Sequence, residues 1–162
     1  MENTYLKYLQ LYHNAGDENG ALFRTLIDNW YGFSKGGPFL NKNDKPKWFN
    51  NPNPVNDRAA LLAMDFVSFD AYEVMEGNHQ DNLVKDHAIP VRILRQKFKE
   101  LQAPNLINIR KFLKRYYKLG VITKTEDVLL NQNKLRSNMP DDWDGSSFLA
   151  RYQAIKICSF KT

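Results

Sequence analysis

The sequence predicts an α+β protein that is predominantly α-helical and carries a small two-stranded sheet. Apolar side chains recur at helical spacing through most of the chain. Two short runs that contain β-branched residues interrupt this pattern, and Gly, Pro and Asn gather between the segments. With 162 residues, of which 43% are apolar, the chain is long enough for one domain, residues 1–162, with a hydrophobic core.

The first half of this domain, residues 1–80, is expected to be helical. Apolar spacing predicts helices over 3–13 and 18–31, and a longer, central buried helix over 57–76 that Asn56 or Asp57 caps. Residues 32–56 are rich in Gly, Pro and Asn, which predicts a long loop. Loops of this length in compact domains are often functional.

Residues 81–140 are expected to contain the sheet and two basic helices. Residues 83–89 read as a strand closed by Pro90, and 121–122 as a second short strand. Between them, 91–102 and 105–118 predict helices with one apolar and one basic side. Thr123 or Thr125 caps a helix over about 126–137, and 141–162 form a C-terminal turn and a last helix over 147–156.

The positive charge is concentrated in the middle of the chain. The net charge is +5, but residues 85–118 hold 10 basic and 2 acidic side chains, whereas residues 1–84 hold 7 basic and 11 acidic ones. Such concentration is typical of a protein that binds a polyanion, and it predicts a nucleic acid, DNA in the first place, as the partner. The side chains expected to contact it are Arg92, Arg95, Lys99, Arg110, Lys111, Lys114, Arg115 and Lys118.

Several classes of protein are excluded at this stage. The only cysteine is Cys158, so neither an internal disulfide framework nor a zinc–cysteine site is expected. No apolar run reaches the ~18 residues that a membrane span needs, so no membrane partner is expected. The N-terminus is polar and lacks the apolar core of a secretory signal, which leads us to expect a cytoplasmic protein.

One short run combines a carboxylate with an imidazole: Asp86-His87-Ala88-Ile89-Pro90. It resembles the Asp-His-hydrophobic-hydrophobic-Pro opening of the HNH nucleases, members of the His–Me finger (ββα-metal) superfamily. In that family one strand delivers Asp-His, a second strand returns and a helix supplies a further metal ligand. The stretch Gly120-Val121-Ile122-Thr123, followed by Lys124-Thr125-Glu126-Asp127, is similar to the family's second strand and helix.

The resemblance implies a catalytic role for His87 as the general base that activates a water. It implies that Asp86 is a metal ligand, with Asp127 or Asn131 as the second one. Oxygen ligands of this kind suit Mg²⁺ or Mn²⁺. Lys134 and Arg136, on the same final helix, are expected to contact the scissile phosphate.

The leading hypothesis is therefore a metal-dependent endonuclease that hydrolyses phosphodiester bonds in DNA. A non-catalytic nucleic-acid-binding protein that uses the basic helices is the first alternative. A protein-binding inhibitor or immunity factor, whose basic surface meets an acidic protein, is the second.

Overall fold

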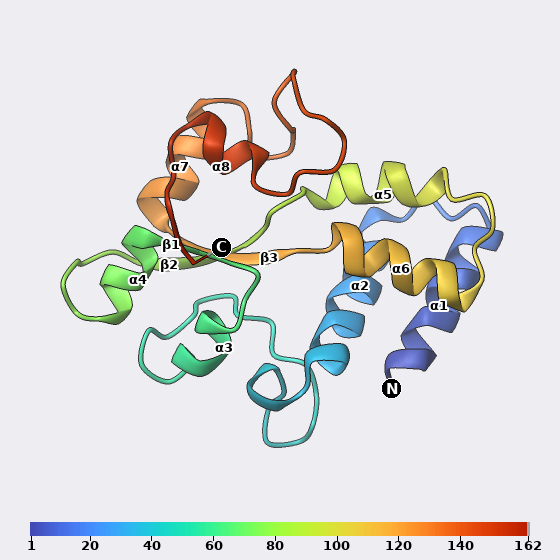
Figure 1. Ribbon diagram of the computed structural model, residues 1–162. Coiled ribbons are helices and arrows are strands. Elements are labelled where there is room, and N and C mark those ends of the chain that lie inside the picture. Colours follow the sequence, from blue (N-terminus) through green and yellow to red (C-terminus); the bar gives the residue numbers. More distant parts are fainter. Residues whose placement is uncertain (162) are drawn as a thin grey trace. The chain divides into compact units, whose positions relative to one another are not determined.

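The computed structural model describes the backbone of residues 1–161 and the side chains of residues 1–160 (Figure 1). The predicted α+β class with mostly helical content is confirmed. Chain contacts divide the protein into two compact units. We call them the helical unit, which comprises Met1–Trp48 and Val91–Tyr117, and the sheet unit, which comprises Phe49–Pro90 and the chain from Lys118 onward.

The helical unit is built around aromatic side chains. Rings of Tyr12, Phe23 and Phe98 pack with centroids 5.3–6.5 Å apart, and Phe112 contacts Phe98 at 5.6 Å. Asn19 and Asn105 cap α2 and α6 through their side-chain oxygens. The elements are α1 (Glu2–Asn14), α2 (Gly20–Lys35), the 3₁₀ helix η1 (Gly37–Phe39), α5 (Val91–Lys99) and α6 (Leu106–Tyr116).

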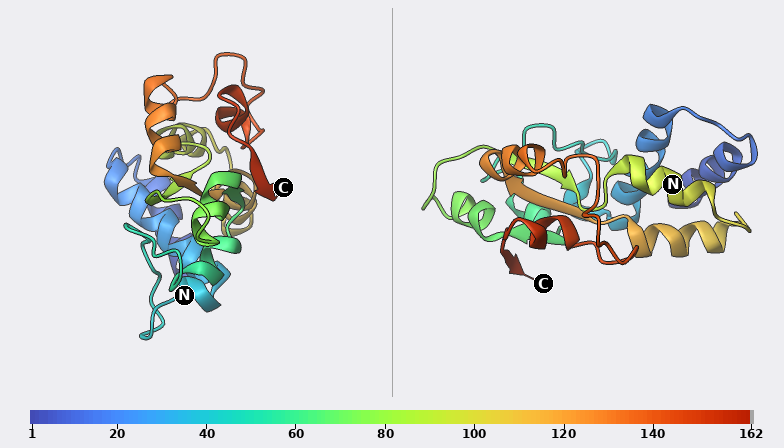
Figure 2. Two further views of the ribbon diagram at one scale, coloured as in Figure 1. Left: turned by 90° about the vertical axis from the view of Figure 1, so that its left-hand side faces the viewer. Right: turned by 90° about the horizontal axis from the view of Figure 1, so that it is seen from above.

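The sheet unit contains a four-stranded mixed sheet in the order β2-β3-β1-β4. Figure 2 shows the fold from two further sides. Strand β3 pairs antiparallel with β2 and parallel with β1, and β1 pairs antiparallel with β4. In chain order the elements are α3 (Arg58–Leu62), β1 (Phe66–Ser68), α4 (Phe69–Met75), β2 (Leu83–His87), β3 (Leu119–Thr123), α7 (Lys124–Gln132), α8 (Ala150–Ala154) and β4 (Ser159–Lys161).

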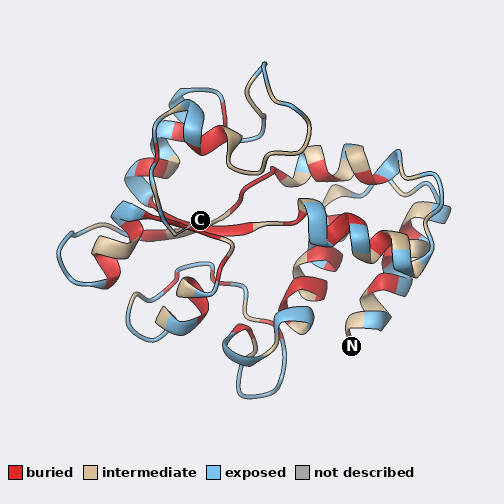
Figure 3. Ribbon diagram, viewed as in Figure 1, coloured by how far each residue is buried: buried red, intermediate tan, exposed pale blue. Residues whose placement is uncertain are grey.

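The prediction of a continuous helix over 57–76 is wrong. This region holds α3, β1 and α4, because Phe66 and Val67 pair with β3 and Ser68 then caps α4. All three residues of β1 are buried. Figure 3 shows the buried parts of the chain in red. A strand buried on both faces is apolar on every side and cannot be told from a buried helix by periodicity.

The expectation of only two strands needs the same correction. The predicted pair corresponds to β2 and β3, but β1 from the first half of the chain and β4 near its C-terminal end complete the sheet. The expected loop over 32–56 also starts later, since α2 continues to Lys35 and ends at Gly36 with φ +63°. Within the described residues no helix is both long and apolar enough to cross a membrane.

The start of α7 shows which of the two candidate threonines acts as its cap. The hydroxyl of Thr123 accepts from the backbone N–H of Glu126, and the Glu126 carboxylate accepts from the N–H of Thr123. This is a capping box, which fixes the turn from β3 into α7. Strand, strand and helix therefore follow in the expected order, although α5 and α6 are inserted between the two strands.

Candidate functional site

The carboxylate of Asp86 is held by two buried side chains of the sheet unit. Its Oδ2 accepts hydrogen bonds from Arg151 Nη2 and Tyr152 Oη, both at 2.6 Å. Arg151 is 1% exposed and also donates to the carbonyls of Ala88 and Leu135, at 3.0 and 2.7 Å. A third carbonyl, that of His87, accepts from the same guanidinium at 2.6 Å. Asp86 thus neutralises a buried cation that ties together the ends of β2 and α7.

Gly120 makes room for this arrangement. Asp86, Gly120 and Phe66 lie side by side on three adjacent strands. A Cβ atom at Gly120 would lie 3.2 Å from the Phe66 side chain and from its carbonyl oxygen. Tyr152 stacks on the Phe66 ring with centroids 4.1 Å apart and reaches Asp86 with its hydroxyl. Burial, together with the nearby Asp86 carboxylate, raises the pKa of Tyr152 above its ordinary value, and the neutral hydroxyl donates to Asp86.

His87 points to the opposite face of the sheet from Asp86. Both residues lie within the regular ladder, with Asp86 opposite Gly120 and His87 opposite Leu119, so their side chains alternate. The face that carries Asp86 is covered by a core cluster that includes Ile122, Leu130 and Tyr152. The expectation that Asp86 and His87 act on one site therefore needs correction, because the strand runs regularly through both residues.

The other expected metal ligands do not converge on His87 either. Asp127 and Asn131 lie on α7, whose Leu130 packs into the cluster on the Asp86 face. Asp127 Oδ2 pairs with Lys124 Nζ at 2.9 Å, and Asn131 is exposed. Within residues 1–161 no three His, Cys, Asp or Glu side chains lie close enough together to hold a metal ion. A site for Mg²⁺ or Mn²⁺ remains a prediction that rests on the HNH resemblance.

Glu126 is a buried polar residue that the sequence analysis did not select. Its Oε1 accepts from the Ser68 hydroxyl at 2.6 Å and from the N–H of Thr123 at 2.9 Å. Desolvation raises the pKa of this carboxyl and outweighs the hydrogen bonds, which lower it. The spacing Thr123-x-x-Glu126 was the signal that could have identified it, since it is the pattern of a capping box.

A second arrangement lies in the helical unit, where α5 and α6 border a groove of about 390 Å³. Three cations line it, Lys97, Lys111 and Arg115, together with a single acidic residue, Glu100. Its remaining lining is apolar, aromatic or amide: Leu101, Asn108, Phe112 and Tyr116. The Tyr116 ring is flanked by Lys97 Nζ and Arg115 Cζ, each 5.0 Å from its centroid. Lys97 and Tyr116 were not among the expected contact residues.

The basic residues expected to bind nucleic acid divide into two groups. Three are paired within the helical unit: Arg95 and Lys99 with Glu18, and Arg110 with Glu2. By contrast, Lys111 and Lys114 are exposed on α6 and form no ion pair among the described residues, and Arg115 is exposed beside Tyr116.

The remaining members of the expected set lie elsewhere. Arg92 is exposed on α5, while Lys118 belongs to the sheet unit, where its Nζ lies over the Phe148 ring. Lys134 and Arg136 were expected on the helix after the second predicted strand, and this expectation is wrong, because α7 ends at Gln132. Both residues follow α7, are exposed and belong to the sheet unit as well.

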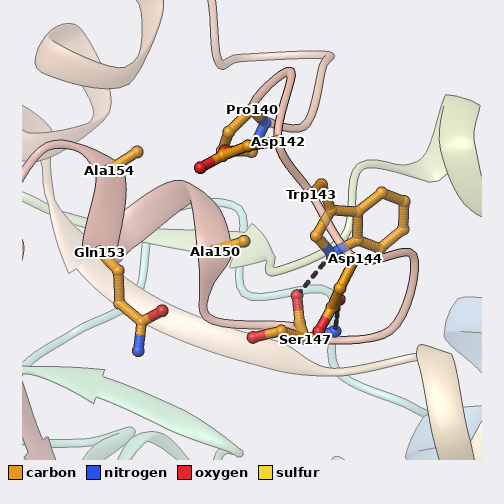
Figure 4. Close-up of a pocket in the computed structure, with 8 residues that line it drawn as sticks. All are labelled: Pro140, Asp142, Trp143, Asp144, Ser147, Ala150, Gln153 and Ala154. Carbon is orange, nitrogen blue, oxygen red and sulfur yellow. Dashed lines mark hydrogen bonds between the residues drawn. The ribbon is translucent and has the colours of Figure 1, made fainter.

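A further hollow, of about 410 Å³, is formed by the turn before α8 (Figure 4). Within it Asp144 Oδ1 accepts from the N–H groups of Ser146 and Ser147, both at 2.8 Å, and these bonds lower the pKa of Asp144. Trp143 Nε1 donates to the Ser147 carbonyl at 2.8 Å, as the dashed line in Figure 4 marks. Asp144 and Trp143 thus have hydrogen-bond partners within the turn itself.

Comparisons with protein-family models, with curated proteins and with solved structures give no match for this chain. The function therefore has to follow from the chain's own residues.

Proposed function

We propose that the protein binds nucleic acid through the groove between α5 and α6. The observation that carries this proposal is the lining of the groove, which Lys97, Lys111 and Arg115 share with the half-buried ring of Tyr116. Cations bind the phosphates of a polynucleotide, and an aromatic ring offers a surface on which a base can stack. The partly apolar floor, made by Leu101 and Phe112, suits a base rather than a free inorganic anion.

The charge of the two units supports the same proposal. The helical unit holds 14 basic and 6 acidic side chains, a net charge of +8, whereas the sheet unit holds 9 basic and 12 acidic ones, a net charge of −3. The entire excess of positive charge is thus in the unit that contains the groove. A concentrated positive field raises the rate at which a protein encounters a polyanion. It also supplies most of the protein's non-specific affinity for nucleic acid.

The salt dependence of DNA binding tests this proposal. We expect a fluorescently labelled oligonucleotide to bind with an affinity that falls steeply with salt. In the double variant Lys111→Gln/Arg115→Gln, the slope of log K against log salt is expected to shrink by roughly 1.4–1.8, because each lost phosphate contact removes roughly 0.7–0.9. Fluorescence anisotropy over a salt series measures both the affinity and the slope.

A charge-matched variant provides the control. Lys42 and Lys45 are exposed in the loop after η1 and do not line the groove. The variant Lys42→Gln/Lys45→Gln has the same net charge as the groove variant and is expected to keep the parent's slope. Equal weakening in both variants, or no binding by the parent protein, contradicts the proposal.

A second candidate is the metal-dependent DNA endonuclease implied by the HNH resemblance. The observation that favours it is the chain order β2, β3, α7, with His87 at the end of β2. The 7% exposed His87 is the residue on which this candidate depends. Its expected metal ligands do not converge, so the candidate rests on this order of elements and not on a formed metal site.

A plasmid-nicking assay tests the endonuclease candidate. Purified protein is incubated with supercoiled plasmid and Mg²⁺ or Mn²⁺, alongside the variants His87→Ala and His79→Ala. His79 is an exposed histidine of the same unit and serves as the control. Metal-dependent nicking that is lost in His87→Ala and kept in His79→Ala supports hydrolysis at this site. Nicking by neither the parent nor the control, or equal nicking by all three proteins, contradicts it.

A further inference from the structure

We infer that the groove between α5 and α6 takes a single-stranded polynucleotide in preference to a duplex. This inference rests on the proposed function and specifies its ligand. Duplex DNA is read by a protein element that protrudes, such as a helix or a two-stranded ribbon that enters the major groove. Here the cations and the aromatic ring line a recess of about 390 Å³ between two helices. A base that is still paired within a duplex cannot enter such a recess, whereas an unpaired base can.

The surroundings of Tyr116 are those of a stacking position. The Tyr116 ring packs against the Phe112 ring with centroids 5.1 Å apart, and this contact orients the Tyr116 ring. Lys97 Nζ and Cζ of the exposed Arg115 each lie 5.0 Å from the centroid of the same ring. Base–aromatic stacking exceeds an exposed cation–π contact in strength. When the two cations bind phosphates instead of the ring, a base can stack on the ring in their place.

The charges around the recess define the path of the backbone. Lys111 and Arg115 are four residues apart on α6 and thus lie on one side of that helix, and Lys97 on α5 also lines the recess. Glu100 is the one acidic side chain among the lining residues, and it repels phosphates from its own position. A single strand can bend to place its phosphates on the cations and avoid this carboxylate. A rigid duplex has no such freedom.

Competition between single strands and duplex tests the inference. Anisotropy is measured with labelled oligothymidylate, with oligouridylate and with a mixed-sequence duplex, each of about 20 nucleotides or base pairs. We expect at least roughly tenfold tighter binding of the single strands than of the duplex at equal salt. The two single strands distinguish DNA from RNA as the source of the ligand.

Two variants of Tyr116 assign the effect to stacking. Tyr116→Leu keeps an apolar side chain of comparable size but removes the ring, and it is expected to weaken single-strand binding roughly tenfold while it leaves weak duplex binding unchanged. Tyr116→Phe keeps the ring and is expected to bind like the parent. Circular dichroism confirms that both variants are folded, and Tyr116→Met provides a second variant without the ring if Tyr116→Leu is not folded.

The outcomes separate this inference from the proposed function. Duplex binding as tight as single-strand binding, with the salt slope still dependent on Lys111 and Arg115, overturns the preference for single strands and leaves the proposed function standing. Unchanged single-strand affinity in folded Tyr116→Leu also overturns the inference. Absence of binding to all three probes overturns both.

Discussion

Arg151 is the residue that most clearly changes the interpretation of Asp86. A buried guanidinium needs a counter-ion and acceptors for its remaining N–H groups, and here one carboxylate and three carbonyls supply them. The sequence pairs Asp86 with its neighbour His87, but the structure pairs it with a residue 65 positions later in the chain. The carboxylate thereby has a structural role in holding β2, α7 and α8 together.

Removal of this buried cation is expected to destabilise the fold strongly. In Arg151→Met the carboxylate of Asp86 loses its buried counter-ion and three carbonyls lose a donor, so the free energy of unfolding is expected to fall by about 3–5 kcal/mol. Urea denaturation followed by circular dichroism measures it. The exposed Arg136→Met serves as the control and is expected to change the free energy of unfolding by about 0.5 kcal/mol or less.

The same measurement distinguishes structural pairing from metal binding at Asp86. Asp86→Asn is expected to lower the free energy of unfolding in metal-free buffer, because a neutral amide leaves Arg151 without its counter-ion. A free energy of unfolding that stays unchanged or rises in this variant would contradict the structural role.

At the scale of elements, the junction of β1, β3 and α7 depends on Glu126. Its carboxylate links Ser68 at the end of β1 to Thr123 at the end of β3, and thus fixes where α7 begins. The group is 5% exposed, and its raised pKa means that the folded protein binds the proton more readily than the unfolded chain does. The stabilisation that this proton gives is fully present below the usual value of 4.5 and is lost as pH rises through the folded-state pKa.

Glu126→Gln is expected to remove this pH dependence. The amide keeps an oxygen that accepts from Ser68 and Thr123, but it carries no titratable proton. The free energy of unfolding of the variant, minus that of the parent, is therefore expected to increase as pH rises from about 4.5 toward neutrality. Urea titrations over this range measure the difference, with the exposed Glu100→Gln as the control for loss of one negative charge. A difference that decreases with rising pH would contradict the assignment.

At the scale of the whole molecule, the chain alternates between the two units. It leaves the helical unit after Trp48, completes β1 and β2 in the sheet unit, returns for α5 and α6, and then re-enters the sheet at β3. Antiparallel neighbours such as β2 and β3 are usually joined by a short hairpin. Here the hydrogen bond from the Ala88 N–H to the Lys118 carbonyl extends their ladder and brings the ends of the inserted segment together. The insertion thereby places almost all of the strongly basic sequence in the helical unit.

Much of the local structure was determined by the sequence itself. The helices α1, α2, α5, α6 and α7 follow from apolar spacing and from capping residues such as Asn105 and Thr123, because these signals lie within one or two turns of each helix. The β2–β3–α7 order and the basic character of α5 and α6 were also readable, since they depend on residue type and order alone.

The tertiary structure decided the features that depend on distant residues. Strand β1 is paired with β3 and β4, both of which are distant in the sequence, so its short apolar run gave no sign of a strand. The face to which Asp86 and His87 each point depends on the register of β2 with β3, and the partner of Asp86 is a distant arginine. The division of cations into those paired with Glu18 or Glu2 and those that line the groove likewise depends on packing within the helical unit. Residue types and their order set what each element can do, but only packing brings particular side chains within bonding distance, and that distance decides which of them remain available for a ligand.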